Sequence, residues 1–288
     1  MPILDFVTER KCFLLIFLLI AQGWSQSNLP TATPATTPTI SDNSFLVEEA
    51  YNQEYGVVQH IQTFTRLYDS GDWAYTFTQE WPVDVAPRNQ LSYTLVAAHA
   101  GAFPGSGGGF GDLFLNYRYQ VTQTGRFAFA PRISLIVPSG DSSRGRGGGG
   151  SGVQFSLPFS LRLTPTWVTH FNAGATVVPH AKDATGARAG TSSFNFGHSL
   201  IWQPKPRFNV MLETVYAGNE SVIGPGQTQR NYSLLMSPGV RWAYNFKNGM
   251  QIVPGIAVPV GVGPSRGEAG ILFYLSIEHP YRKAKGQD

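Results

Sequence analysis

Hydrophobic and polar side chains alternate along most of this chain, and residues 111–137 illustrate the pattern. In the first half of this stretch apolar and aromatic residues occupy almost every second position, with polar residues such as Asn116 and Arg118 between them. A turn that contains Gly125 follows, and then a second alternating run, 127–137. Alternation with a period of two predicts strands with one apolar and one polar face, and the glycine-bearing turn predicts a β-hairpin.

The same alternation recurs often enough to predict twelve strands. We expect them at residues 57–66, 73–81, 90–100, 111–121, 127–137, 152–163, 167–178, 191–202, 207–217, 231–245, 250–259 and 268–281. From the fourth strand onward, short connections alternate with long ones such as 138–151, 179–190 and 218–230. An even number of strands, with short turns at one end and long loops at the other, is typical of bacterial outer-membrane barrels. The predicted fold class is therefore all-β, a closed antiparallel transmembrane β-barrel of about twelve strands.

Four prolines fall inside these predicted strands: Pro131, Pro158, Pro238 and Pro254. A closed barrel has no edge strand that could accommodate a missing N–H group. Each proline therefore requires a bulge or a lost ladder hydrogen bond.

The composition agrees with a membrane barrel. Charged residues make up 14% of the chain and aromatic residues 13%, whereas roughly a quarter of the residues in soluble domains are charged. None of the six lysines falls on a predicted strand, as expected where side chains contact lipid, because a charge at mid-bilayer costs about 2–4 kcal/mol. The net charge of +3 comes from scattered residues without a basic stripe, so we expect no nucleic-acid partner.

Residues 1–25 are predicted to be a cleaved secretory signal peptide. Arg10 and Lys11 precede an apolar run, 12–21, that is too short to cross a bilayer as a helix, and small residues follow it. The single cysteine, Cys12, lies in this leader, so we expect no disulfide.

The remainder of the chain divides into three parts. Residues 26–56 are interpreted as a disordered linker rich in Thr, Pro and Ser, with a short helix over 42–56. The outer-membrane β-barrel would occupy 57–281 and a C-terminal tail 282–288.

Four tryptophans lie close to connections that the pattern places at the short-turn end. Amphipathic rings prefer the headgroup level of a bilayer, so we expect these side chains to form an aromatic girdle. They are Trp81, Trp167, Trp202 and Trp242.

Ionisable side chains on the polar face are candidates for a solute path through the lumen. They are Glu80, Asp112, Arg118, Arg132, Arg162, His170, Glu213, Arg241 and Glu278. Opposite charges could pair across neighbouring strands and fill the barrel, or they could line a narrow passage. Eight-stranded barrels are filled by side chains and barrels of sixteen strands hold a channel, so twelve leaves both alternatives open. Residues 42–56 could also plug the opening.

Enzyme chemistry is not expected. His198 and Ser199 are adjacent on a strand, so they face opposite ways and cannot form a Ser–His dyad. His170 shares a face with Asn172, but the sequence links no serine to them. The histidines show no metal-ligand spacing, and we expect no cofactor.

Several short motifs resemble the outer-membrane family named after the MetA pathway of phenol degradation. The resemblance covers residues 45–281 and depends on Val58-Gln59-His60-Ile61, on the stretch from Asp72-Trp73 to Trp81-Pro82, on Gln90-Leu91-Ser92-Tyr93-Thr94, on Gly109-Phe110-Gly111-Asp112 and on Pro138-Ser139-Gly140-Asp141. It implies a transporter-like barrel in the bacterial outer membrane, and the family name implies uptake of aromatic compounds.

These observations predict an exported outer-membrane barrel that allows passage or uptake of small solutes, aromatic or apolar ones among them. Its partners would be outer-membrane lipid, a small solute and the barrel-assembly machinery. One alternative is a non-transporting structural or adhesive barrel that binds through 138–151 and 218–230. A membrane-embedded hydrolase that uses His170 is less favoured, and a soluble exported β-sandwich is a distant fourth reading.

Overall fold

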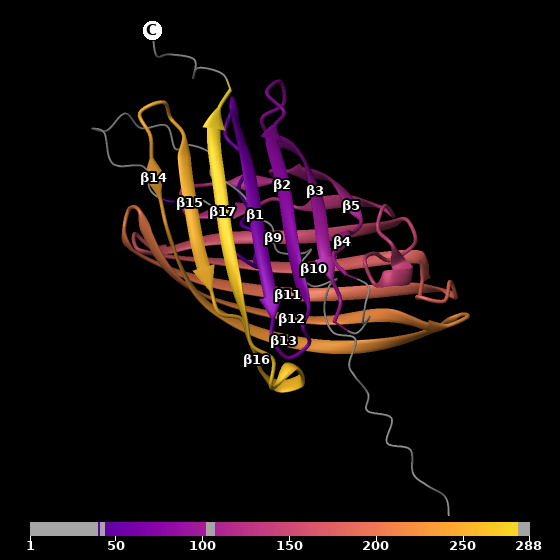
Figure 1. Ribbon diagram of the computed structural model, residues 1–288. Helices are drawn as coiled ribbons and strands as arrows, with labels where there is room; N and C mark the ends of the chain where they lie inside the picture. The colour runs from indigo at the N-terminus through magenta and orange to yellow at the C-terminus, as the bar shows by residue number, and fades with distance from the viewer. Residues whose placement is uncertain (1–39, 41–43, 102–106, 282–288) are drawn as a thin grey trace, which may run out of the picture.

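A computed structural model describes residue 40 and residues 44–101 and 107–281 of the 288-residue chain. The predicted signal peptide, most of the predicted linker and the predicted tail lie outside these described residues. The described chain forms one antiparallel sheet that curves until its first and last strands pair (Figure 1).

The strands follow one another around the barrel in chain order. They are β1 Val57–Leu67, β2 Trp73–Pro82, β3 Asn89–His99, β4 Gly109–Phe110, β5 Leu113–Tyr119, β6 Thr122–Gln123, β7 Phe127–Phe129, β8 Arg132–Val137, β9 Gly152–Thr164, β10 Trp167–Lys182, β11 Arg188–Lys205, β12 Phe208–Gly224, β13 Gln227–Trp242, β14 Tyr244–Asn245, β15 Gln251–Ala257, β16 Val260–Gly261 and β17 Gly270–Pro280. Within the described residues, two short 3-10 helices, η2 Ser142–Arg144 and η3 Gly263–Ser265, lie in connections.

Twelve wall strands result, because some strands are interrupted. β4 to β6 form one wall strand, and so do β7 with β8, β13 with β14 and β15 with β16. β1 pairs with β17 along its full length and closes the cylinder. The predicted fold class, a closed antiparallel barrel of twelve strands, is confirmed. In the described part of the chain, no helix is long and apolar enough to cross a bilayer.

The four prolines expected inside strands take two kinds of position. Pro131 separates β7 from β8. β13 pairs with β15 through residues 239–241 and with β16 through residues 235–236, so its ladder is broken at Pro238. Proline has no N–H to donate, so each of these residues leaves one ladder hydrogen bond unmade. Pro158, Pro238 and Pro254 nevertheless lie within β9, β13 and β15, and the barrel stays closed around them.

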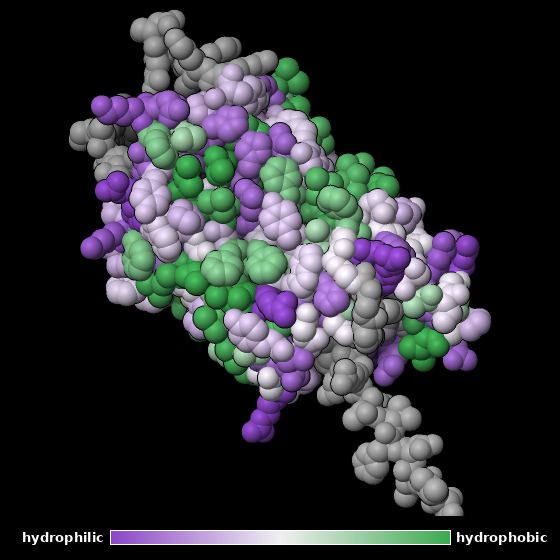
Figure 2. Space-filling view, in the orientation of Figure 1, coloured by the Kyte–Doolittle hydropathy of each residue, from purple (hydrophilic) through white to green (hydrophobic). Residues whose placement is uncertain are grey.

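Apolar side chains point outward and polar ones inward. On β9, Phe155 and Leu157 are 49% and 48% exposed, whereas Ser156 between them is fully buried. Thr76 and Glu213 are also fully buried. Figure 2 shows several patches of hydrophobic side chains on the outer face, with more polar residues between them. A sheet with this arrangement fits lipid outside and a polar interior.

The barrel has two unlike ends. The short-turn end holds connections such as 165–166 and 206–207, together with the start of β1 and the end of β17. The long-loop end holds 138–151 and 262–269. All four girdle tryptophans lie near the short-turn end, and Trp167 stacks on Trp202 with ring centroids 6.2 Å apart.

Two connections predicted as long loops, 179–190 and 218–230, are mostly strand. β10 and β11 leave only residues 183–187 between them, and β12 and β13 leave only 225–226. The second hairpin turns at Gly226, whose φ of 68° is easily adopted by glycine. Its polar residues suggested a loop, but they pair across the hairpin, as Arg230 does with Glu220 at 2.8 Å.

The outer turn beside Asp72 provides a test of pH dependence. Asp72 lies between β1 and β2, and one carboxylate oxygen accepts the Gly101 N–H at 2.7 Å. Burial raises the pKa of Asp72 from 3.8 to about 6, Glu268 adds to the rise, and the Gly101 and Ser70 hydrogen bonds oppose it. The stability that this carboxyl contributes is therefore full below pH 3.8 and is lost as pH rises through about 6.

We expect the carboxyl carbon of Asp72 to titrate near pH 6 in an NMR measurement on aspartate-labelled protein in detergent. Asp72→Asn should remove that resonance and flatten the pH dependence of protection at the Gly101 amide. A midpoint near 4, the value of an exposed aspartate, would contradict the burial of this carboxyl.

Candidate functional site

An N-terminal segment occupies the lumen of the barrel. Residues 44–53, here called the plug, are buried, and residues 54–56 connect them to β1. The plug rises from the short-turn end, where the Ile40 N–H donates to Pro206 O, and returns there, where the Gln53 N–H donates to Gln90. The short helix predicted over 42–56 is wrong for the described residues 44–56, which have irregular backbone.

Side chains of the barrel wall explain why the plug needs no helix. Seven plug N–H groups donate to wall side chains: Phe45, Leu46 and Val47 to Glu213, Glu48 to Asn172, Ala50 to Ser160, Asn52 to Gln120 and Gln53 to Gln90. Buried backbone groups must find partners inside the protein. The wall supplies these partners, so an irregular segment can lie in the lumen.

Glu213 forms the main anchor of the first half of the plug. Its Oε1 accepts the N–H groups of Leu46 and Val47 at 2.8 and 3.0 Å, and its Oε2 accepts that of Phe45 at 3.1 Å. The carboxylate is fully buried. Hydrogen bonds to an ionised acceptor are stronger than those between neutral groups, so these three hydrogen bonds fix the position of the plug relative to β12.

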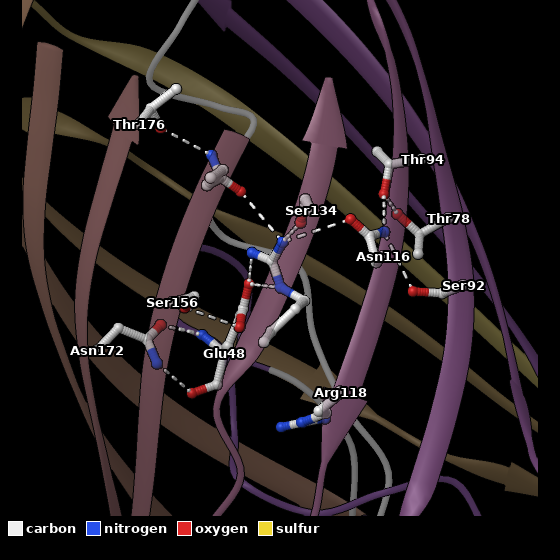
Figure 3. Close-up of polar contacts among 12 residues, drawn as sticks. Glu48, Thr78, Ser92, Thr94, Asn116, Arg118, Ser134, Ser156, Asn172 and Thr176 are labelled. Carbon is white, nitrogen blue, oxygen red and sulfur yellow. Dashed lines mark hydrogen bonds and ion pairs between the residues drawn. The ribbon is translucent and has the colours of Figure 1, made fainter. Parts of the chain in front are cut away.

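Glu48 is fully buried in the lumen and forms an ion pair with Arg132. Its carboxylate accepts from Arg132 Nε at 2.9 Å and from Arg132 Nη2, and Ser156 Oγ donates to the second oxygen at 3.0 Å (Figure 3). The Asn172 amide binds the backbone of Glu48 on both sides, accepting from its N–H and donating to its carbonyl. Every polar group of Glu48 is therefore held by the wall.

Arg132 faces a second arginine across the sheet. β5 and β8 place Arg118 directly opposite Arg132, and both side chains are buried. Arg118 donates to the carbonyls of Glu49 and Tyr51 in the plug and to Ala130 O in the wall. Like charges opposite one another destabilise a strand pair, so oxygens of the plug offset a repulsion that is built into the wall.

The ring of Phe45 fills a slot on the opposite side of the lumen. A Cβ on Gly239 or Gly255 would lie 2.6 or 2.5 Å from ring atoms of Phe45, so only glycine permits this approach. Tyr274 closes the slot, with ring centroids 5.1 Å apart. The slot therefore has the shape and the apolar lining that a flat aromatic ring requires.

Neutral polar groups continue from Arg132 along the wall. We call Thr78, Ser92, Thr94, Asn116, Ser134, Gln154 and Thr176 the hydroxyl–amide belt. Asn116 Nδ2 donates to Ser92 at 3.1 Å, Gln154 Nε2 donates to Thr176 at 3.2 Å, and Arg132 Nη1 contacts the carbonyl oxygens of both amides (Figure 3). The belt orients Arg132 without supplying it with a carboxylate.

The remaining candidate residues take different positions. Glu80 is buried and accepts from Gln90 at 2.9 Å, and Arg241 is buried. Arg162 lies half-buried at the short-turn end, where it donates to Gln203, and Glu278 is half-buried. The expectation of ion pairs between neighbouring strands is wrong for Arg132, whose carboxylate partner belongs to the plug.

Asp112 lies outside the lumen centre and organises the long-loop end. Its carboxylate accepts the N–H groups of Gly140 and Gly148 at 3.0 and 2.8 Å. Burial raises its pKa, while these two N–H groups oppose the rise. Loop 138–151 is thereby held against the barrel mouth, and Asp112 has a structural role.

His170 has partners that the sequence could not reveal. Its Nδ1 lies 2.7 Å from Ser160 Oγ, and its Nε2 lies 3.8 Å from Glu49. This order resembles a hydrolytic triad, but all three side chains are buried, and Ser160 also accepts the Ala50 N–H. Glu49 belongs to the plug, so removing the plug to admit a substrate would remove the acid. The serine, histidine and glutamate can be close together, or a substrate can reach them, but the two conditions exclude each other.

Comparisons with known proteins address the fold alone. No family model matches the chain, and no curated protein matches it. An outer-membrane channel from Pseudomonas putida F1 is similar in structure, with a TM-score of 0.60, 13% identity and coverage of 78% of this chain and 95% of that one. NanC porin gives a TM-score of 0.52 at 8% identity, over 76% and 98% of the two chains.

The chain therefore has the fold of outer-membrane porins and channels. The finer resemblance to the phenol-degradation family is not established by these comparisons.

Proposed function

We propose that this protein is an outer-membrane barrel for passage of small solutes, closed by its own N-terminal plug. The observation that carries the proposal is the plug itself. A twelve-stranded barrel has room inside for more than its own side chains, and here a ten-residue peptide, 44–53, fills that room through noncovalent contacts. When those residues leave, the volume they occupied becomes a polar path.

The orientation follows from the two ends of the barrel. Short turns of outer-membrane barrels lie in the periplasm, so the plug would enter from the periplasmic side. The four tryptophans near that end would lie at the headgroup level and contact outer-membrane lipid. Aromatic solutes are favoured among the candidates because the slot of Gly239, Gly255 and Tyr274 already accepts an aromatic ring.

The test is single-channel recording on purified protein in planar bilayers, with liposome swelling by arabinose as a second measurement. We expect low conductance from the intact chain and a several-fold higher conductance after deletion of residues 44–53. Deletion of residues 142–145 in the outer loop is the control, because it shortens the chain without reaching the plug. A folded deletion variant that neither conducts nor swells liposomes would refute passage and favour a structural barrel.

A further inference from the structure

The plug meets the wall through the carboxylate of Glu48. Glu48 is fully buried, and its oxygens are shared between Arg132 and Ser156. Besides Glu48, the Arg132 guanidinium contacts Asn116, Ser134 and Gln154, which are neutral. The wall thus presents a guanidinium and a hydroxyl to one carboxylate, and that carboxylate comes from the plug.

The charge balance at this position reverses when the plug leaves. Arg118, Arg132, Glu48, Glu49 and Glu80 interact electrostatically here. With the plug in place, three glutamates face two arginines, a formal balance of −1. Without it, Glu80 alone faces the two arginines, a balance of +1.

The positions of the two arginines define a specific binding site rather than a region of diffuse positive potential. Arg118 and Arg132 are cross-strand partners, so the two side chains start from paired positions on one wall of the lumen. The hydroxyl–amide belt holds Arg132, and Ala130 O accepts from Arg118. A guanidinium fork that is fixed in this way binds a carboxylate through paired hydrogen bonds.

We propose that the open lumen binds and selects small organic carboxylates, and that Glu48 occupies the carboxylate site as an internal mimic of the solute. Arg132 is the main ligand, Ser156 the second donor, and Arg118 supplies the adjacent positive charge. With the aromatic slot across the lumen, aromatic acids are the solute class that the wall suits best. This proposal rests on the proposed function, because a solute must enter the lumen to reach the site.

The experiment compares benzoate with benzamide, its neutral counterpart, on the variant that lacks residues 44–53. We expect anion-selective reversal potentials in a KCl gradient and current block by benzoate. Adding Arg132→Gln should weaken the block about tenfold or more, since it removes a charge-assisted contact. The matched control is Arg144→Gln, which removes the same charge from an exposed loop. Equal block by benzoate and benzamide, or an unchanged block in Arg132→Gln, would overturn the carboxylate site while leaving passage intact.

A competition measurement covers the case in which Arg132→Gln fails to fold. In the full chain with Ser44→Cys and Cys12→Ser, benzoate should compete with Glu48 and accelerate maleimide labelling of the plug. Benzamide should not accelerate it. Labelling that is independent of benzoate would refute the mimic, and absence of all conductance in the deletion variant would instead refute the proposed function.

Discussion

Glu213→Ala is expected to release the plug from the lumen. The change removes the acceptor of three buried N–H groups, those of Phe45, Leu46 and Val47. Each buried group left without a partner costs about 1–3 kcal/mol, so the opening equilibrium should shift by about 3 kcal/mol or more, which is over a hundredfold. The N–H groups regain water when the plug leaves, and the β12 ladder with β11 and β13 does not depend on this side chain.

The measurement is maleimide labelling of Ser44→Cys in a Cys12→Ser background, where the reporter is the only thiol. Ser44 is buried against Ser199 in the docked plug, so labelling reports opening. Glu213→Gln is the matched control, because it keeps one carbonyl oxygen as an acceptor and should give an intermediate rate. If the Ser44→Cys thiol is labelled as slowly in Glu213→Ala as in the parent chain, the three hydrogen bonds to Glu213 do not hold the plug.

Arg132→Met should release the plug by a different route. It leaves the Glu48 carboxylate buried, with Ser156 as its remaining side-chain donor. Removing one partner of a buried ion pair destabilises by about 3–5 kcal/mol. We expect labelling of Ser44→Cys to rise by about two to four orders of magnitude. The barrel should remain closed because the substitution leaves the backbone ladder of β8 in place.

The double variant Arg132→Met with Glu48→Leu isolates the pair. Replacing both members of a buried ion pair with apolar residues of similar size is often neutral or stabilising, so protection should return. If the double variant is as accessible as Arg132→Met alone, the ion pair is not what holds Glu48.

The strands and their facing were predictable because their signal is local. Val153 to Leu163 alternates so regularly that only one register puts its apolar residues on lipid. The long-loop end was harder to predict, because beyond the lipid both faces of a strand meet water and alternation fades, as in β12 and β13. The sequence therefore predicted which segments form strands, but not how far each strand extends.

The candidate site was predictable only in part. Arg118 and Arg132 were recognised as inward residues, and their cross-strand pairing follows from the hairpin that joins them. The plug carries no periodicity, so Glu48 and Glu49 could not be assigned to these arginines from sequence. Likewise, His60 Nε2 and His279 Nε2 lie 3.2 Å apart only because β1 pairs with β17. These two strands are far apart in the sequence, so no short turn between them fixes their register.

Residue 40 and the end of the plug at Gln53 both contact the wall at the same rim of the barrel. Residues 44–53 can therefore leave the lumen through that rim without parting any strand. Assembly can proceed in the reverse order: the barrel strands pair first, and the plug enters the lumen last. Docking of the plug, which closes the lumen, and pairing of β1 with β17, which closes the barrel, are then separate steps, each with its own free energy.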